Sequence, residues 1–348
     1  MDVNLETLFG NADLYFHAFG PEDKLSFLPM DRDHFAQSIF CDQRIEPAQR
    51  EVFRIPIQAM MQAYEQRGYL APQLSYIHQI AQTGSTILSR ALDIKGRSLA
   101  IREPAHLRQV GVLGGAGFDV ASPPKNFGPM LGFSLSMLGK RYADAQPIIV
   151  KGNVPTSFIA EAINKADPGR PTIFLHYGLE EYLAAVLRTP NHMQWVENVA
   201  GEMRIAEAPH FAELADAATP LKAAGLWLGM MKAFQAVEDT NGNARALDAN
   251  YLFEERVPTL MAASKLFEMP LEKAEAEEIA NGELFTRYGK NPDQPYDPSA
   301  RLERRKATLA EIPEEIRAAQ DWAAKKAADM GLRDEFHAPL VGDGGKLL

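Results

Sequence analysis

The chain has few of the features that mark several whole classes of protein. It contains a single cysteine, Cys41, so no internal disulfide can form, and we predict no metal site. It has no run of about 18 apolar residues, which argues against a membrane-spanning helix. Its first twenty residues carry Asp2, Glu6 and Asp13 in place of a basic, apolar leader. We therefore expect a cytoplasmic protein without a secretory signal.

Positive charge is also scarce in this chain. Lysine and arginine number 36 against 46 aspartates and glutamates, which gives a formal net charge of −10. A negative surplus of this size argues against nonspecific binding to nucleic acid or to an acidic membrane face, although a local basic pocket can exist inside an acidic protein. We therefore expect neither a nucleic acid nor a membrane as partner.

Apolar residues are present in the amount and spacing of an α/β protein. They make up 46% of the 348 residues, enough for a substantial core. Short apolar runs that are typical of buried strands alternate with longer stretches whose apolar residues have helical spacing. These runs lie at residues 74–80, 98–102, 147–150, 171–176 and 244–247. The alternation predicts a three-layer α/β fold with a mostly parallel sheet.

The predicted strands occupy only part of the chain. Residues 1–70 precede the first strand and show helical apolar stripes, so we expect a helical N-terminal cap. The α/β domain would cover residues 71–335 and end in a helical lid that includes an amphipathic helix over residues 313–330. Residues 336–348 are expected to form a flexible tail.

The most informative stretch follows the first predicted strand. Residues 82–86 read Gln-Thr-Gly-Ser-Thr, and apolar residues at helical spacing follow directly. A strand that turns sharply into a helix directs free backbone N–H groups and the positive end of the helix dipole at one point, where an anion binds. The alternative is an ordinary strand–turn–helix with small residues. The loop of the nucleotide kinases requires an additional glycine and a lysine that this stretch lacks.

This loop resembles the 5′-phosphosulfate loop of the sulfotransferases, whose pattern after a strand is roughly Pro-Lys-Ser-Gly-Thr-Thr. Gly84, Ser85 and Thr86 match that pattern, and Thr83 stands in its serine position. The resemblance implies a P-loop fold in which residues 83–86 bind 3′-phosphoadenosine 5′-phosphosulfate. Gln82 stands where the family carries a lysine or arginine that stabilises the leaving oxygen. It would occupy this catalytic position without a charge, because glutamine can donate only a neutral hydrogen bond.

Two further strand ends carry candidate residues. Glu103 follows the second predicted strand and Lys151 the third, at the ends that face the ligand crevice in a parallel sheet. Glu103 is the best-placed general base, and its surroundings, Glu-Pro-Ala-His-Leu, resemble a segment of some carbohydrate sulfotransferases. Lys151 would offset the anionic charge that Gln82 leaves uncompensated. Alternatively, Glu103 caps the next helix or pairs with Arg102 or Arg108, and Lys151 is a solvated strand-end lysine.

The later part of the chain departs further from the sulfotransferase pattern. At the end of the fourth strand the family carries arginines and then a serine that hold the donor's 3′-phosphate, whereas this chain leaves only His176 to donate there. Residues 281–306 are polar and rich in cations. The resemblance implies a basic flap over the nucleotide that includes Arg287 and Lys290. The alternative is a solvated loop followed by a charged helix.

A stretch rich in glycine and proline at residues 111–129 invites a dinucleotide-binding interpretation. Its glycines fall at positions 111, 114, 115 and 117, so it contains no Gly-x-Gly-x-x-Gly, and no strand precedes it. We expect it to be a long mobile loop near the crevice.

These features together predict a sulfotransferase-like transferase that moves a sulfuryl group from a nucleotide donor to a hydroxyl or amine of a small-molecule or carbohydrate acceptor. Two alternatives remain open. A phosphotransferase of the P-loop class would require magnesium, held by Glu103 or Asp248. A non-catalytic protein that binds a nucleotide or a partner on the same fold would account for the uncharged Gln82 and the missing 3′-phosphate residues.

Overall fold

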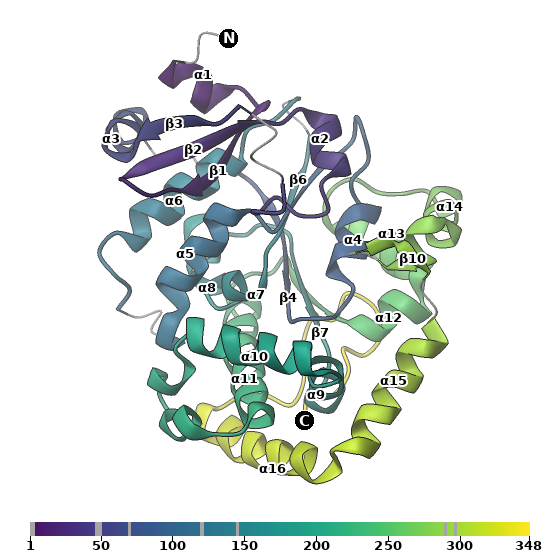
Figure 1. The fold of residues 1–348 in the computed structure, drawn as a ribbon. Coiled ribbons are helices and arrows are strands. Elements are labelled where there is room, and N and C mark those ends of the chain that lie inside the picture. The colour runs from purple at the N-terminus through teal and green to yellow at the C-terminus, as the bar shows by residue number, and fades with distance from the viewer. Residues whose placement is uncertain are drawn as a thin grey trace.

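A five-stranded parallel sheet forms the centre of the protein (Figure 1). The computed structural model describes residues 4–45, 51–68, 71–118, 122–143, 146–288, 291–295 and 298–348. The sheet consists of β4 (Ser75–Gln79), β5 (Leu99–Arg102), β6 (Ile148–Lys151), β7 (Thr172–His176) and β8 (Ala244–Asp248). All five predicted strands are confirmed, and each begins within one residue of its predicted start.

The order of the strands places β4 in the middle of the sheet. The order is β5-β6-β4-β7-β8, and each neighbouring pair is parallel. The chain leaves β4 toward β5 at one edge, whereas it leaves the adjacent strand β7 toward β8 at the other edge. Such a reversal of direction between neighbours opens a crevice at the carboxyl ends of the strands. The turn after β4 lies at this crevice.

Helices cover both faces of the sheet, which confirms the predicted three-layer α/β fold (Figure 1). On one face, Ile87 and Leu88 belong to the same buried cluster as Ile77 of β4. On the other face, Phe174 of β7 stacks on Phe234 with ring centroids 4.7 Å apart. The first face carries α4 (Ser85–Ala91) and α13 (Arg256–Leu266), and the second carries α5 (Ala105–Gly115), α6 (Phe127–Leu138), α8 (Ala160–Ala166) and α11 (Thr219–Glu238).

Among the described residues, every helix is too short or too polar to traverse a lipid bilayer.

Further helices and strands surround the carboxyl edge of the sheet and connect its layers. The further elements of the α/β part are α7 (Val154–Ser157), α9 (Leu179–Val186), α10 (Pro190–Glu202), α12 (Ala249–Glu254), α14 (Lys273–Asn281), α15 (Pro298–Glu311), α16 (Pro313–Met330), and the antiparallel pair β9 (Arg287–Tyr288) and β10 (Asn291–Pro295). Short 3-10 helices cover Ala116–Phe118, Ile205–Glu207, Ala212–Asp216 and Glu283–Phe285. The amphipathic helix predicted over residues 313–330 is confirmed as α16.

The N-terminal cap contains the predicted helices but combines them with a sheet that the sequence did not predict. It contains a three-stranded antiparallel sheet in the order β1-β2-β3, whose first two strands form a hairpin. Apolar residues of this sheet, such as Phe16 and Phe27, pack with Phe133 of α6. The cap consists of α1 (Leu5–Gly10), β1 (Leu14–Phe19), β2 (Lys24–Pro29), α2 (Arg32–Gln37), β3 (Phe53–Pro56) and α3 (Ile57–Arg67).

Part of the stretch predicted as a mobile loop is helical instead. Residues 111–115 complete α5, and α6 begins at Phe127. The glycines that suggested a loop serve close packing: a Cβ atom on Gly114 would collide with the ring of Phe127. Residues 119–121 lie outside the described part of the chain.

The predicted flexible tail is packed against the domain, which corrects that prediction. Phe336 and Leu347 are buried, and Ala246 of β8 exchanges backbone hydrogen bonds with Ala338 and Leu340. At the other end of the segment, the Leu179 N–H donates to the Leu347 carbonyl over 2.9 Å. We call residues 336–348 the C-terminal strap. Polar composition suggested a free end, but two buried apolar side chains are enough to fix the strap to the core.

The packing of the strap predicts different effects for two neighbouring leucines. Leu347 is 0% exposed, so Leu347→Ala should lower the free energy of unfolding by about 2 kcal/mol or more through lost burial and a cavity. Leu348 is 43% exposed, so Leu348→Ala should stay within about 0.5 kcal/mol of wild type. Denaturant unfolding of the three proteins measures both values. Equal stability of the two variants would mean that the strap is not docked in solution.

Candidate functional site

The turn between β4 and α4 has a backbone that requires its glycine. Gln82 and Gly84 both adopt left-handed conformations, with φ values of 68° and 80°. A Cβ atom on Gly84 would lie 2.6 Å from the Phe253 ring and 3.1 Å from the Leu252 side chain, both of α12. Any larger residue at position 84 would therefore have an unfavourable backbone conformation and would also collide with side chains of α12. The predicted strand–turn–helix is confirmed, and we call residues 81–86 the β4–α4 turn.

Several polar donors in the β4–α4 turn have no acceptor in the protein. Within the described residues, the backbone N–H groups of residues 82–86 donate no hydrogen bond to backbone or side chain. The Thr86 hydroxyl is buried and has no partner either, whereas Thr83 donates to the Ile80 carbonyl over 3.1 Å. Buried donors are nearly always satisfied in folded proteins, by protein, water or ligand. A cluster of them at one turn suits the oxygens of an anion.

Arg188 brings a positive charge to Gln82. Its Nη2 atom lies 3.4 Å from Gln82 Oε1, and its Nε atom lies 3.1 Å from His192 Nε2 at the start of α10. Arg188 lies between α9 and α10, and α9 follows β7, the strand next to β4. The uncharged position in the loop motif therefore has a cation in direct contact. Sequence analysis missed Arg188 because no local motif contains it.

Glu103 and Lys151 form an ion pair at the ends of β5 and β6. Lys151 Nζ contacts Glu103 Oε1, and Arg44 Nη2 lies 3.2 Å from Glu103 Oε2. The Lys151 side chain is 1% exposed, so the solvated alternative for this lysine was wrong. Burial lowers the pKa of Lys151 from its ordinary value, and the Glu103 carboxylate opposes that shift.

Arg102 and Arg108, the alternative partners predicted for Glu103, pair with other carboxylates, and Glu103 pairs with Lys151 and Arg44 instead. Arg102 pairs with Asp93 over 2.9 Å, and Arg108 pairs with Glu202 over 2.5 Å. Glu103 itself has a left-handed backbone with φ of 52°, a conformation that non-glycine residues seldom adopt. Such strain is common where a side chain must point in a required direction, and here it accompanies the pairing with Lys151.

Two other predicted phosphate ligands, His176 and Arg287, are engaged within the protein. His176 is buried against the Phe336 ring of the strap, with centroids 4.9 Å apart, and burial lowers its pKa to about 4. It is therefore neutral at physiological pH and covered by the strap. Arg287 is exposed in β9 and pairs with Glu283 over 3.3 Å. Lys290 lies outside the described residues.

Helix α15, rather than Arg287, brings the basic segment to the carboxyl edge of the sheet. Arg301 donates to the Tyr177 hydroxyl over 2.7 Å and stacks 4.2 Å above the Phe253 ring, which itself packs on Gly84. Arg305 lies 4.2 Å above the Tyr177 ring and pairs with Glu181 over 2.6 Å. The cations at residues 301 and 305 therefore line the ends of β7 and β8.

The strap closes the β7–β8 side of the edge over an acidic cavity. A space of about 450 Å³ lies between the start of α9, Asp248, α16 and residues 346–348. Its carboxylates include Glu181 and Asp248, and Lys346 of the strap lies among them. Burial raises the pKa of Asp248 to about 6, and the nearby Glu181 carboxylate adds to the shift.

No family model matches this chain, and no curated protein matches it. Among the described residues, no group of three or more histidine, cysteine, aspartate or glutamate side chains is arranged to hold a metal ion. The residues of the carboxyl edge are therefore the basis for assigning a function.

The raised pKa of Asp248 predicts a pH-dependent effect of removing its charge. The folded pKa of about 6 exceeds the ordinary value of 3.8, so the folded chain binds more protons between these values. The contribution of Asp248 to the free energy of unfolding is full below pH 3.8 and is lost as the pH rises through 6. Asp248→Asn cannot titrate and still accepts from the Asn250 N–H, so it should stabilise the protein by about 1 kcal/mol near neutral pH and less in acid.

Denaturant unfolding at several pH values between acid and neutral measures this difference. Asp321→Asn removes an exposed carboxylate on the wall of the same cavity and controls for net charge. A stabilisation by Asp248→Asn that is independent of pH would contradict the raised pKa.

Proposed function

We propose that this protein is a sulfotransferase-like enzyme that binds the 5′ end of a nucleotide donor at the β4–α4 turn and transfers its sulfuryl group to a hydroxyl or amine acceptor. The observation that carries the proposal is the set of unpaired donors of residues 82–86, at the carboxyl end of the central strand and in contact with Arg188. Anions bind where such donors converge, because each N–H and the start of the helix contribute positive potential.

Arg188 supplies the charge that the loop motif lacks. In sulfuryl transfer the acceptor oxygen bonds to sulfur while the bond from sulfur to the bridging oxygen of the donor breaks. Negative charge then grows on the leaving bisphosphate, and a fixed cation beside that oxygen stabilises the transition state. Gln82 and Arg188 are in contact at 3.4 Å, so they act there as one unit in this proposal.

Glu103 is the proposed base for the acceptor proton. Its carboxylate stands at the same carboxyl edge, beyond β6, and pairs with Lys151 and Arg44. These two contacts fix the position of the carboxylate that would accept the proton. Proton transfer to a positioned carboxylate is commonly worth roughly 10²–10⁴ in rate.

The donor that fits this arrangement is 3′-phosphoadenosine 5′-phosphosulfate. The family's arginines are missing at the end of β7, but Arg301 and Arg305 of α15 reach that region of the edge. We assign them to the 3′-phosphate in place of Arg287 and His176. Both arginines already contact aromatic rings and polar side chains, so they are held in place before a ligand arrives.

A second candidate is a protein that binds the nucleotide without transferring its sulfuryl group. The pairing of Glu103 with two cations favours it, because both oxygens of the only proposed base are already engaged within the protein. The two candidates share the ligand and differ in turnover. Binding of adenosine 3′,5′-bisphosphate together with hydrolysis or transfer from the sulfated donor separates them.

Removal of the Arg188 charge should weaken both binding and turnover. Arg188→Gln should reduce affinity for the sulfated donor about 10-fold and sulfuryl transfer or donor hydrolysis further, because the charge matters most in the transition state. Gln82→Lys in the Arg188→Gln background should recover part of the loss by placing a cation at the same point. Calorimetry measures binding, and release of bisphosphate measures turnover.

The matched control is Arg317→Gln, which removes an exposed arginine of α16. Unchanged donor affinity and turnover in Arg188→Gln would remove Arg188 from the site. Wild-type protein that binds bisphosphate but never turns over donor would favour the non-catalytic candidate.

Thr86 offers a test in which stability and binding change in opposite directions. Its buried hydroxyl has no protein partner, so Thr86→Val should raise the stability of the ligand-free protein by about 1 kcal/mol. The same change removes a donor from the proposed anion site and should lower bisphosphate affinity about 10-fold. Thermal unfolding with and without bisphosphate measures both effects. Full ligand-induced stabilisation of the variant would exclude Thr86 as a ligand.

A further inference from the structure

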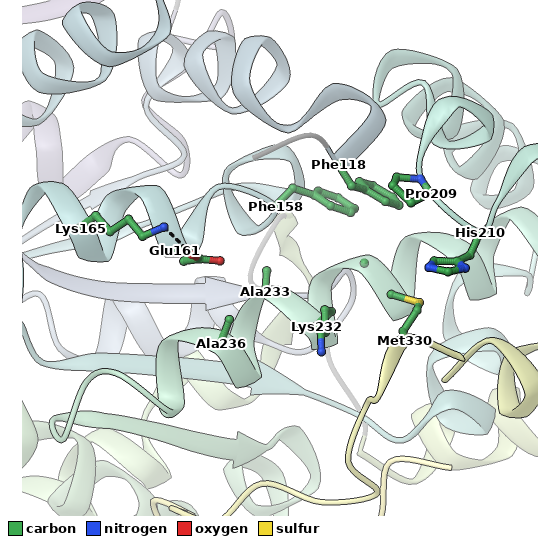
Figure 2. Close-up of a pocket in the computed structure, with 11 residues that line it drawn as sticks. Phe118, Phe158, Glu161, Lys165, Pro209, His210, Lys232, Ala233, Ala236 and Met330 are labelled. Atoms are coloured by element: carbon green, nitrogen blue, oxygen red, sulfur yellow. Dashed lines mark hydrogen bonds and ion pairs between the residues drawn. The ribbon is translucent and has the colours of Figure 1, made fainter. Parts of the chain in front are cut away.

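A second cavity lies on the helical face of the domain, away from the β4–α4 turn. It encloses about 490 Å³ between α8, α11, the end of α16 and residues 209–210. Figure 2 shows two phenylalanine rings along one wall and short alanine side chains of α11 opposite them. No strand-end residue of the proposed sulfotransferase site lines this space. Its volume is within the range of about 300–1,000 Å³ that small-molecule sites occupy.

The aromatic wall is held in a fixed position. Phe118 stacks on the buried Phe158 with centroids 4.7 Å apart and planes 5° from parallel. Both rings rest on Gly229 of α11, where a Cβ atom would lie 2.8 Å from one ring and 2.9 Å from the other. Phe118 is half-buried, so part of its surface faces the cavity, and a flat ring in the cavity can pack against it.

Two residues that line the cavity have strained backbones. Phe118 and His210 adopt left-handed conformations with φ values of 51° and 71°, although neither is a glycine. Residues in such conformations cost of order 1–3 kcal/mol each and concentrate at ligand sites. Here the two strained residues place an aromatic ring and an imidazole on the same side of the cavity, as Figure 2 shows.

The rim of the cavity is positively charged, in contrast to the acidic protein around it. Glu161 and Lys165 neutralise each other across 2.5 Å. Lys232 of α11 is exposed at the rim and forms no ion pair within the described residues. In a chain with a net charge of −10, an unpaired lysine beside an apolar wall favours an anionic ligand.

We propose that this cavity binds a planar aromatic carboxylate. Its ring packs against Phe118 and between the alanines of α11, and its carboxylate pairs with Lys232. The apolar lining excludes strongly hydrated sugars, and the single unpaired lysine suits one negative charge. This site is separate from the proposed sulfotransferase site, and its existence does not depend on that function.

The binding of 2-naphthoate tests the proposal, with methyl 2-naphthoate as the neutral probe of the same shape. Calorimetry or ligand-observed NMR on the full chain should show one saturable naphthoate site and at least about 10-fold weaker binding of the ester. Lys232→Gln removes the charge and keeps most of the side chain, so it should weaken naphthoate about 2- to 5-fold, the range of an exposed charge pair. Lys325→Gln on α16 removes an exposed lysine outside the cavity and should leave the affinity unchanged.

A steric variant completes the test. Ala233 is half-buried in α11 on the wall opposite the rings, so Ala233→Phe should fill the space and abolish binding. Ala236→Leu serves the same purpose if the larger residue prevents folding, which thermal unfolding reports. Absence of saturable binding to wild type, equal affinity for acid and ester, or full binding by a folded filled variant would each overturn the proposal.

Discussion

The carboxyl edge of this protein depends on the close approach of α12 to Gly84. The ring of Phe253 occupies the space that a side chain at position 84 would need, and the left-handed backbone there turns β4 into α4. Arg301 stacks on the same ring. One contact thus joins the central strand, the helix after the last strand and the basic helix α15. A substitution at residue 84 would alter the turn and the positions of cations that are distant in sequence.

The cations of the edge come from segments that no local pattern connects. Arg44 belongs to the N-terminal cap, Lys151 to β6, Arg188 to the link between α9 and α10, and Arg301 to α15. They place positive charge at the edge of a chain whose net charge is −10, close to the carboxylates of Glu103, Glu181 and Asp248. Arg44 and Lys151 share the Glu103 carboxylate, whereas Arg188 contacts Gln82 and Arg301 contacts Tyr177. The cations therefore lie at three separate points of the edge.

The fold was more accessible to sequence reasoning than the site. Buried parallel strands are continuous apolar runs, and all five were recognisable because each is short and bounded by polar residues. The cap was misjudged because Leu14–Phe19 is followed at once by a charged turn, and a hairpin next to short helices has no long periodicity. Local windows also missed Arg188, since its contact with Gln82 arises only when β7 lies beside β4. The strap was misread for a related reason. Glycines at 342, 344 and 345 suggested freedom, yet all three have left-handed backbones that define its path.

The hydrogen bond from the Leu179 N–H to the Leu347 carbonyl makes the β7 side of the crevice different from the β4 side. At β7 the start of the following helix is already occupied by a carbonyl of the same chain, whereas at β4 the equivalent N–H groups have no protein partner among the described residues. Two helix starts at the same edge of one sheet therefore differ, because the first N–H of α9 already has an acceptor in the chain and the N–H groups of residues 82–86 have none among the described residues. For the proposed nucleotide ligand, this difference favours the orientation in which the more strongly charged end lies toward β4.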